Sequence, residues 1–149
     1  MKSTATTKLN LPASYIECFR KLQTVSQQNN VNYMLVGAHA RDIVFEHYLG
    51  VASQRLTTDI DIGLSVDTWE TFKKFKSSLV DQGFEENSKS QQRLSYGVTS
   101  NPTNEDPVQL DVVPHGGING PNNEISWPPD GSMKMSVLGF QEPMIRHYL

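Results

Sequence analysis

Cysteine is nearly absent from this sequence, and long apolar runs are missing altogether. Cys18 is the single cysteine, so no intramolecular disulfide can form, which favours a reduced, intracellular setting. No run approaches the roughly 20 apolar residues that a membrane span needs, and residues 1–10 are polar and rich in threonine, without the apolar core of a secretion signal. We expect a soluble, cytoplasmic protein with no membrane partner.

Net charge is also small. The formal charge is -3 and the isoelectric point is near 5.8, so the whole molecule has no general attraction to nucleic acid, although a local basic patch could still exist. The 149 residues, 37% of them hydrophobic, are enough for one compact core. We therefore expect a single domain over residues 1–149.

The N-terminal half alternates apolar segments with turn signals. A helix is predicted within residues 10–30, because apolar side chains recur every three residues. Residues 33–36 predict a short buried strand that ends at Gly37. A second helix should follow over residues 40–48, and residues 51–57 form a polar linker. The apolar stripe of the first helix consists of Ile16, Phe19, Leu22 and Val25.

From Thr58 the apolar period changes from three or four residues to two. Aspartates alternate with isoleucines in the segment from Thr58 to Ile62, which is typical of a half-buried strand. Asp59 and Asp61 therefore leave the same face of that strand. A later strand repeats the pattern, since Asp111 points away from the apolar side chains on either side of it. Those neighbours are Val108, Leu110 and Val112.

The remaining elements are less marked. A helix is predicted to open at Asp67, with Glu70 as the reciprocal partner of a capping box, and to end at Gly83. Its apolar stripe consists of Trp69, Phe72, Phe75 and Leu79. A strand follows, with Leu94, Tyr96 and Val98 on one face, and a loop spans 101–107. Beyond Pro114 we expect loops over 115–123 and 127–131, a last strand within 133–140, and the opening of a helix over 141–149.

The aspartates suggest a cation site. Two carboxylates at i and i+2 on one strand have Cα atoms about 6.5 Å apart, and a third on a neighbouring strand would complete a set. Carboxylate oxygens suit Mg²⁺ or Mn²⁺, and a pair of such ions can stabilise both the attacking and the leaving oxygen in phosphoryl transfer. The alternative is a solvated strand face without chemistry. The candidate metal ligands and catalytic residues are Asp59, Asp61 and Asp111.

The order of these motifs resembles the nucleotidyltransferase superfamily that includes DNA polymerase beta. An apolar strand ends at Gly37, a helix follows, Asp-x-Asp lies on the next strand, and a later strand carries Asp111 between apolar residues. Residues 36–42 and 55–61 look more narrowly like AbiEii-type nucleotidyltransferases, many of which are toxins of toxin-antitoxin pairs. The segments 110–114 and 127–129 also fit a branch of that family.

The resemblance covers residues 30 to 140 approximately and implies a fold. That fold is α+β, with a nucleotidyltransferase-like small mixed β-sheet, helices packed mainly on one face, and the aspartates on the open face. It divides the chain into an N-terminal helix (10–30) and a catalytic core (31–140). The C-terminal helical region of relatives is expected to be absent, which leaves the activity of so short a chain open.

The resemblance also implies an activity, the transfer of a nucleoside monophosphate from an NTP to an acceptor hydroxyl. The aspartates would hold two cations. Asp111 would bind the cation that lowers the pKa of the acceptor hydroxyl, and it could also accept the proton of that hydroxyl. The nucleotide would contact the glycine turn, where Ala38 replaces the usual Gly or Ser, so that backbone amides take the phosphates. The implied nucleotide-binding residues are Gly37, Ala38, Arg41 and Thr58. The acceptor could be tRNA, a protein or a small molecule, and a cognate antitoxin is a possible partner.

Several residues near this constellation have two interpretations. Arg41 could reach triphosphate oxygens or pair with Asp42. Arg55 could support the aspartates or be an ordinary loop residue. His39 and His115 are candidate bases, or ordinary turn histidines. The basic side chains of residues 73–76 predict a solvated helix face, or a contact with an RNA backbone.

Two other functions compete with nucleotidyl transfer. A non-catalytic module could keep the fold and bind nucleotide or an antitoxin, and Ala38 and the short chain motivate that hypothesis. A metal-dependent phosphohydrolase is the third, but the sequence offers no additional His/Asp cluster for it.

Overall fold

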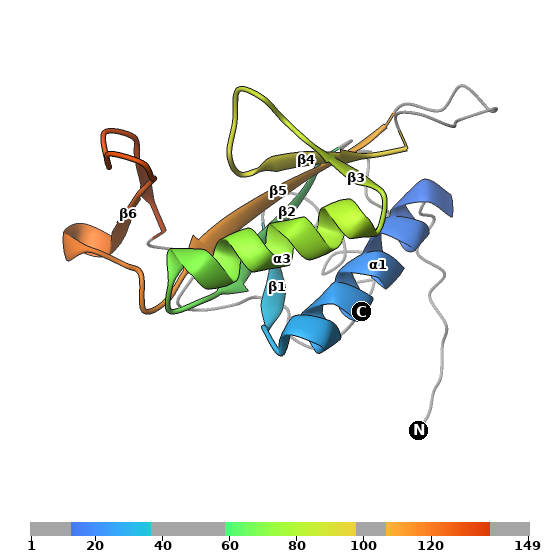
Figure 1. Ribbon diagram of the computed structural model, residues 1–149, viewed down its shortest axis with the longest axis horizontal. Coiled ribbons are helices and arrows are strands. Elements are labelled where there is room, and N and C mark those ends of the chain that lie inside the picture. The colour runs from blue at the N-terminus through green and yellow to red at the C-terminus, as the bar shows by residue number, and fades with distance from the viewer. Residues whose placement is uncertain (1–12, 37–58, 98–106, 138–149) are drawn as a thin grey trace, which may run out of the picture.

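The computed structural model describes residues 13–36, 59–97 and 107–137. These residues form a five-stranded mixed sheet, two helices and a separate two-stranded sheet (Figure 1). This is the predicted α+β fold class. In chain order the elements are α1 (Ala13–Asn29), β1 (Tyr33–Val36), β2 (Asp59–Ser65), α3 (Trp69–Asp81), β3 (Phe84–Glu86), β4 (Arg93–Tyr96), β5 (Val108–His115), the short 3-10 helix η1 (Pro121–Asn123), β6 (Glu124–Ser126) and β7 (Lys134–Ser136).

The large sheet has the strand order β1-β2-β5-β4-β3. Its centre is the parallel pair of β2 and β5, and the other neighbouring strands are antiparallel. Parallel strands need a long crossover connection, and the segment between β2 and β5 supplies it with α3 and the β3–β4 hairpin. The two strands that carry the aspartates thus become direct neighbours although about 50 residues separate them in sequence.

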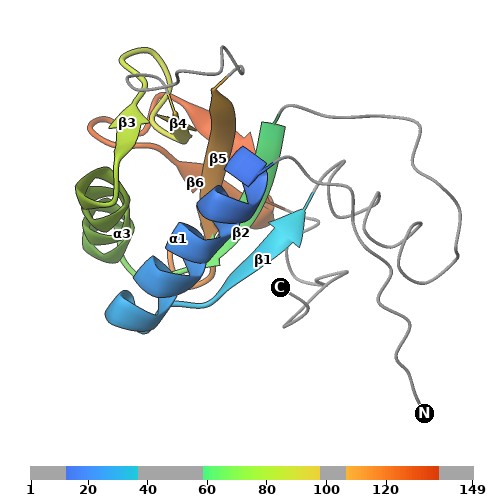
Figure 2. The same ribbon diagram turned by 90° about the vertical axis from the view of Figure 1, so that its right-hand side faces the viewer.

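Both described helices cover the same side of the sheet (Figure 2). From that side the sheet contributes fully buried side chains, among them Ile60, Ile62 and Leu110. Alternation at a two-residue period explains why one face of β2 is entirely apolar. The prediction of helices packed mainly on one face is confirmed for the described residues.

The apolar stripe of α1 differs from the prediction at one position. Ile16 was expected in the stripe, but its side chain is 42% exposed. Tyr15 and Cys18 are buried in its place, because a contact face on an α-helix follows a mixed three- and four-residue spacing rather than a strict repeat of three. The buried side chains of α1 are Tyr15, Cys18, Phe19, Leu22 and Val25.

The start of α3 also needs a correction. Asp67 was predicted as the helix cap, but Thr68 is the N-cap and its hydroxyl accepts a hydrogen bond from the backbone N–H of Thr71 at 3.1 Å. A threonine can satisfy this helical N–H as an aspartate would, so the sequence offered two caps in adjacent positions. The predicted end of the helix is confirmed, because Gly83 follows it with φ of 102°.

Three short strands were missed or misjudged. The strands β3 and β6, each of three residues, were not predicted, and the last strand is β7 alone among the described residues of 133–140. Strand β5 runs on through Pro114 to His115, where a loop was expected. Such short strands carry too few alternating positions to stand out from loops in a sequence.

Other predictions lie outside the described residues. These are the helix over 40–48, the linker 51–57, Val98, the loop residues 101–106 and the helix over 141–149. The organisation of residues 1–149 as a single domain stays a prediction.

None of the described helices is long and apolar enough to cross a membrane.

Candidate active site

A row of side chains crosses four strands of the sheet. Strand register places Val36 of β1 opposite Asp61 of β2, Asp61 opposite Asp111 of β5, and Asp111 opposite Arg93 of β4. Residues directly opposite one another on neighbouring strands point to the same face of a sheet, with backbones about 4.8 Å apart. Two of the three predicted aspartates therefore stand side by side.

The third aspartate belongs to the next row. Asp59 lies two residues before Asp61 on β2 and opposite Gln109 of β5, so its side chain leaves the same face as the other two aspartates. All three aspartates are half-buried, whereas Ile60 and Leu110, which alternate with them, are fully buried on the helix-covered face. The predicted aspartate face is thus confirmed as a feature of the described sheet.

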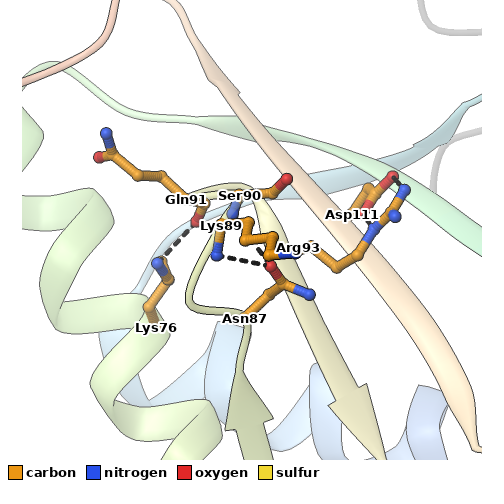
Figure 3. A network of polar contacts seen from close by, with 7 residues as sticks. All are labelled: Lys76, Asn87, Lys89, Ser90, Gln91, Arg93 and Asp111. Carbon is orange, nitrogen blue, oxygen red and sulfur yellow. Dashed lines mark hydrogen bonds and ion pairs between the residues drawn. The ribbon is translucent and has the colours of Figure 1, made fainter.

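Asp111 is bound by an arginine across the strand pair (Figure 3). The Nε of Arg93 donates to Oδ1 of Asp111 at 2.9 Å, and Nη2 donates to Oδ2 at 3.1 Å. This is a bidentate, charge-assisted pair, the strongest common arrangement between a guanidinium and a carboxylate. The side chain of Arg93 is 34% exposed and that of Asp111 is 16% exposed, so the pair stands where the protein opens to solvent.

The positive charge of Arg93 interacts with all three aspartates. The hydrogen bonds to Asp111 and the charge of that carboxylate raise the pKa of Arg93 above its ordinary value, partial burial opposes this, and the charges of Asp59 and Asp61 add to the increase. An arginine is protonated at any physiological pH, so this shift changes no charge state. The shift indicates that the guanidinium lies close enough to all three carboxylates to interact with their charges.

The β3–β4 hairpin that carries Arg93 is fixed at its turn (Figure 3). The side-chain oxygen of Asn87 accepts hydrogen bonds from the backbone N–H groups of Lys89 and Ser90 at 2.8 and 3.0 Å. The Nζ of Lys76 on α3 donates to the backbone oxygen of Gln91 at 2.6 Å. The helix and the turn thus hold the start of β4 in place.

Lys76 corrects the prediction of a solvated basic face over residues 73–76. Its side chain is only 12% exposed and its Nζ lies 3.3 Å from a carboxylate oxygen of Glu86. The same nitrogen is 5.5 Å from the centre of the Phe72 ring. A long apolar stem that lies on the core while the charged end reaches a partner is typical of lysine. Lys73 and Lys74 are exposed as predicted.

One observation favours a divalent-cation site here, and another speaks against it. Three carboxylates on one face, two of them in register, are the hard oxygen donors that Mg²⁺ and Mn²⁺ prefer. Within residues 13–36, 59–97 and 107–137, however, no group of three or more His, Cys, Asp or Glu side chains is placed so that it could hold a metal ion as it stands. The backbone suits the predicted ligands, while the carboxylate of Asp111 is turned to Arg93 instead.

The predicted nucleotide-binding residues Gly37, Ala38, Arg41 and Thr58 lie outside the described residues, as do His39 and Arg55. Their chain neighbours are nevertheless informative. Val36 ends β1 directly beside Asp61, and Asp59 begins β2. Both segments that were predicted to bind nucleotide are therefore attached by sequence to the rows that hold the aspartates.

His115 is not brought to the aspartates. It lies at the end of β5 opposite Ser65, four residues beyond Asp111, which corresponds to about 13 Å along a strand. Its backbone oxygen accepts a hydrogen bond from the N–H of Val66 at 2.9 Å. His115 thus ends strand β5 instead of lying in a turn as predicted, and its distance from Asp111 argues against a role as a base beside that carboxylate.

Arg93 is the site residue that the sequence did not reveal. Its alternation with Leu94 and Ser95 could have placed it on the face opposite the core. No sequence pattern states, however, that β4 pairs with β5 in the register that sets Arg93 against Asp111.

No family model and no curated protein matches the chain. Among solved structures, a CCA-adding enzyme in complex with CTP is similar to it over 70% of this chain, with 18% identity and a TM-score of 0.45. A Thermotoga maritima CCA-adding enzyme complexed with tRNA is similar over 72% of this chain, with 19% identity and a TM-score of 0.43. The chain spans about a fifth of the length of these structures, covering 21% and 22% of them. These comparisons do not support the AbiEii-type resemblance. Because the identities and TM-scores are low, the activity of the chain has to be argued from its own residues.

Proposed function

We propose that the chain is a nucleotidyltransferase, which moves a nucleoside monophosphate from an NTP to an acceptor hydroxyl with release of pyrophosphate. The observation that carries the proposal is the register of the central parallel pair, which sets Asp61 opposite Asp111 with Asp59 two residues away on the same face. The resemblance of the glycine turn, the Asp-x-Asp strand and the later aspartate strand to that superfamily supplies the reaction class. The two strands that carry these aspartates are direct neighbours in the sheet.

In this proposal Asp59, Asp61 and Asp111 hold two divalent cations, Mg²⁺ or Mn²⁺. When bound, such cations would neutralise phosphate charge and lower the pKa of the acceptor hydroxyl. The carboxylate of Asp111 would accept the proton of that hydroxyl. Its position suits this role, because it lies on the central strand β5 and its side chain is still 16% exposed.

The substrates are the less determined part of the proposal. The triphosphate would lie against Gly37, Ala38, Arg41 and Thr58, since the first three belong to the turn and helix start that the sequence predicts after β1. The acceptor would be an RNA such as tRNA, a protein or a small molecule. A toxin role in the cytoplasm, with a cognate antitoxin as partner, rests on the AbiEii-type resemblance of the sequence alone.

A binding experiment tests the proposal. Each of the four NTPs is titrated into the purified chain by calorimetry, with and without Mg²⁺, and the double variant Asp59→Asn/Asp61→Asn is treated in the same way. We expect binding that requires Mg²⁺ and becomes at least about 100-fold weaker in the variant, since even indirect supports of a metal site are worth 10 to 100-fold. Asp81→Asn is the matched control, because it removes one exposed carboxylate from the end of α3.

Two results would contradict the proposal. One is the absence of Mg²⁺-dependent binding in a sample that circular dichroism shows to be folded. The other is equal binding by the double variant and the wild-type chain. Pyrophosphate release in the presence of candidate acceptors then separates transfer from binding alone.

A second function, a non-catalytic binding module, is favoured by one observation. Arg93 already neutralises Asp111 with two hydrogen bonds, and within the described ranges no three acidic or other ligating side chains are arranged to hold a metal ion. Such a module would bind nucleotide or a protein partner without Mg²⁺ and release no pyrophosphate. The calorimetric titration distinguishes the two functions by the requirement for Mg²⁺.

A further inference from the structure

Lys76 is a nearly buried lysine that joins α3 to the β3–β4 hairpin (Figure 3). Its Nζ donates to the backbone oxygen of Gln91 at 2.6 Å and lies 3.3 Å from a carboxylate oxygen of Glu86. The side chain is 12% exposed, and such burial of a charged end costs free energy that its partners must offset. The lysine thus ties the helix to a residue that stands two positions before Arg93.

Gln91 has a second contact through its side chain. Its Nε2 donates to the backbone oxygen of Pro128 at 2.7 Å. The residue before Pro128 is Trp127, whose buried ring lies 5.1 Å from the ring of Trp69 and 5.6 Å from that of Phe72, both on α3. The turn after β6 is therefore packed on the same helix, and Gln91 is held between two parts of one support.

The pairing of β4 with β5 passes this position on to Arg93. The backbone oxygen of Gln92 accepts a hydrogen bond from the N–H of Val112 at 2.7 Å. Backbone hydrogen-bonded and non-hydrogen-bonded pairs alternate along antiparallel strands, so the next pair, Arg93 and Asp111, is a non-hydrogen-bonded one with Cα atoms about 4.5 Å apart. Side chains lie closest in such pairs. A shift of residues 91–92 would therefore act directly on the contact between guanidinium and carboxylate.

We propose that Lys76 is a positioning residue, which fixes Asp111 by way of Arg93. The lysine holds Gln91 and thereby the start of β4, and the guanidinium binds both oxygens of the carboxylate. This inference rests on the proposed function, because the direction of that carboxylate matters only if Asp111 takes part in the reaction. It also gives a role to the turn at Pro128, which supports Gln91 from its other side.

The Nε–H proton of Arg93 reports on this arrangement in the full chain. It is the donor of the 2.9 Å bond to Asp111, and its ¹H–¹⁵N signal is identified by its loss in Arg93→Lys. Lys76→Met keeps an unbranched apolar stem beside Phe72 but removes the charged end. We expect the Nε–H proton to exchange with water about 10-fold faster in this variant, since one charge-assisted hydrogen bond that holds β4 is lost.

Urea unfolding separates positioning from a purely structural role. Replacement of a nearly buried charge by an apolar side chain is often neutral or stabilising. The other partner of Lys76 is Glu86, which is 58% exposed, so water can take the place of the lysine there. The midpoint of unfolding should therefore stay the same or rise in Lys76→Met, while exchange at Arg93 becomes faster.

Two other variants complete the comparison. Lys73→Met removes an exposed lysine from the same helix and should leave exchange at Arg93 unchanged. Gln91→Glu keeps the length of the side chain but cannot donate to Pro128. It should accelerate exchange about 3-fold, less than Lys76→Met, because the bond that it removes is exposed. It also tests the inference should Lys76→Met fail to fold.

Three results would overturn the inference: unchanged exchange at Arg93 in Lys76→Met and Gln91→Glu, equal acceleration in Lys73→Met, or a lower urea midpoint in Lys76→Met with faster exchange at the backbone amides of the whole sheet. The measurement uses no nucleotide, so it is independent of the calorimetric titration. Failure of Mg²⁺-dependent NTP binding contradicts the proposed function, whereas unchanged exchange contradicts this inference alone.

Discussion

The two faces of the parallel strand pair differ in both burial and charge. On the helix-covered face, Ile60, Ile62 and Leu110 are fully buried. On the opposite face, the residues between them are Asp59, Asp61 and Asp111, all half-buried. Along each strand, successive side chains therefore alternate between a buried apolar environment and a half-buried acidic one.

The difference separates what stabilises the fold from what would perform chemistry. Burial of apolar area is the main favourable term in folding, and β2 and β5 supply it mainly from the helix-covered face, with Val113 as a buried residue on the other face. Carboxylates crowded on the other face repel one another, and a paired arginine offsets part of that repulsion. Acidic residues kept in such an arrangement are candidates for binding rather than for stability.

The largest expected effect is on the helix-covered face. Leu110→Ala removes a fully buried side chain and should lower the free energy of unfolding by about 2 to 5 kcal/mol, since it leaves a cavity beneath the helices. Gln109→Ala, a half-buried neighbour on the other face, is the matched control and should cost less than about 1 kcal/mol. Urea denaturation measures both, and equal losses would remove the distinction between the faces.

Charge should be tolerated poorly in the core between the helices and the sheet, where Cys18 of α1 is buried. Burial raises the pKa of the Cys18 thiol from 9.0 to about 12, so the unfolded chain ionises first as the pH rises. The stability from this group is complete below about pH 9 and is lost between pH 9 and 12, with a slope of up to about 1.4 kcal/mol per pH unit.

Cys18→Ala tests that slope. The variant should lose less stability than the wild-type chain between pH 9 and 12, in denaturant titrations at several pH values. Tyr33, whose pKa burial raises to about 12 with a further contribution from the charge of Cys18, keeps a smaller slope in the variant. Identical slopes in the two proteins would show that folding does not raise the pKa of the thiol.

The smallest effect on stability is expected on the aspartate face. Asp61→Asn should change the free energy of unfolding by less than about 1 kcal/mol, without a preferred loss, because it removes one of several crowded negative charges. Thermal unfolding followed by circular dichroism measures the change. A loss as large as that of Leu110→Ala would mean that the aspartates serve the fold, and the comparison of the faces would have to be reversed.

Local patterns predicted most of the described secondary structure. The period of two in β2, the helical stripe of Phe72, Phe75 and Leu79, and the stop at Gly83 all occur where they were expected. The errors are local as well. Thr68 rather than Asp67 caps α3, and Ile16 is exposed, because adjacent residues of similar chemistry compete for one position and only packing selects between them.

The sequence by itself determined that Asp59 and Asp61 share a face and that Asp111 leaves its strand opposite to an apolar set, because side-chain direction in a strand follows from a fixed two-residue period. Only the tertiary structure decided that β2 and β5 are neighbours, that Asp61 stands opposite Asp111, and that Arg93 binds Asp111. Strand pairing and register join residues far apart in the chain, and they are set by the burial of one whole face against α1 and α3 rather than by any local signal.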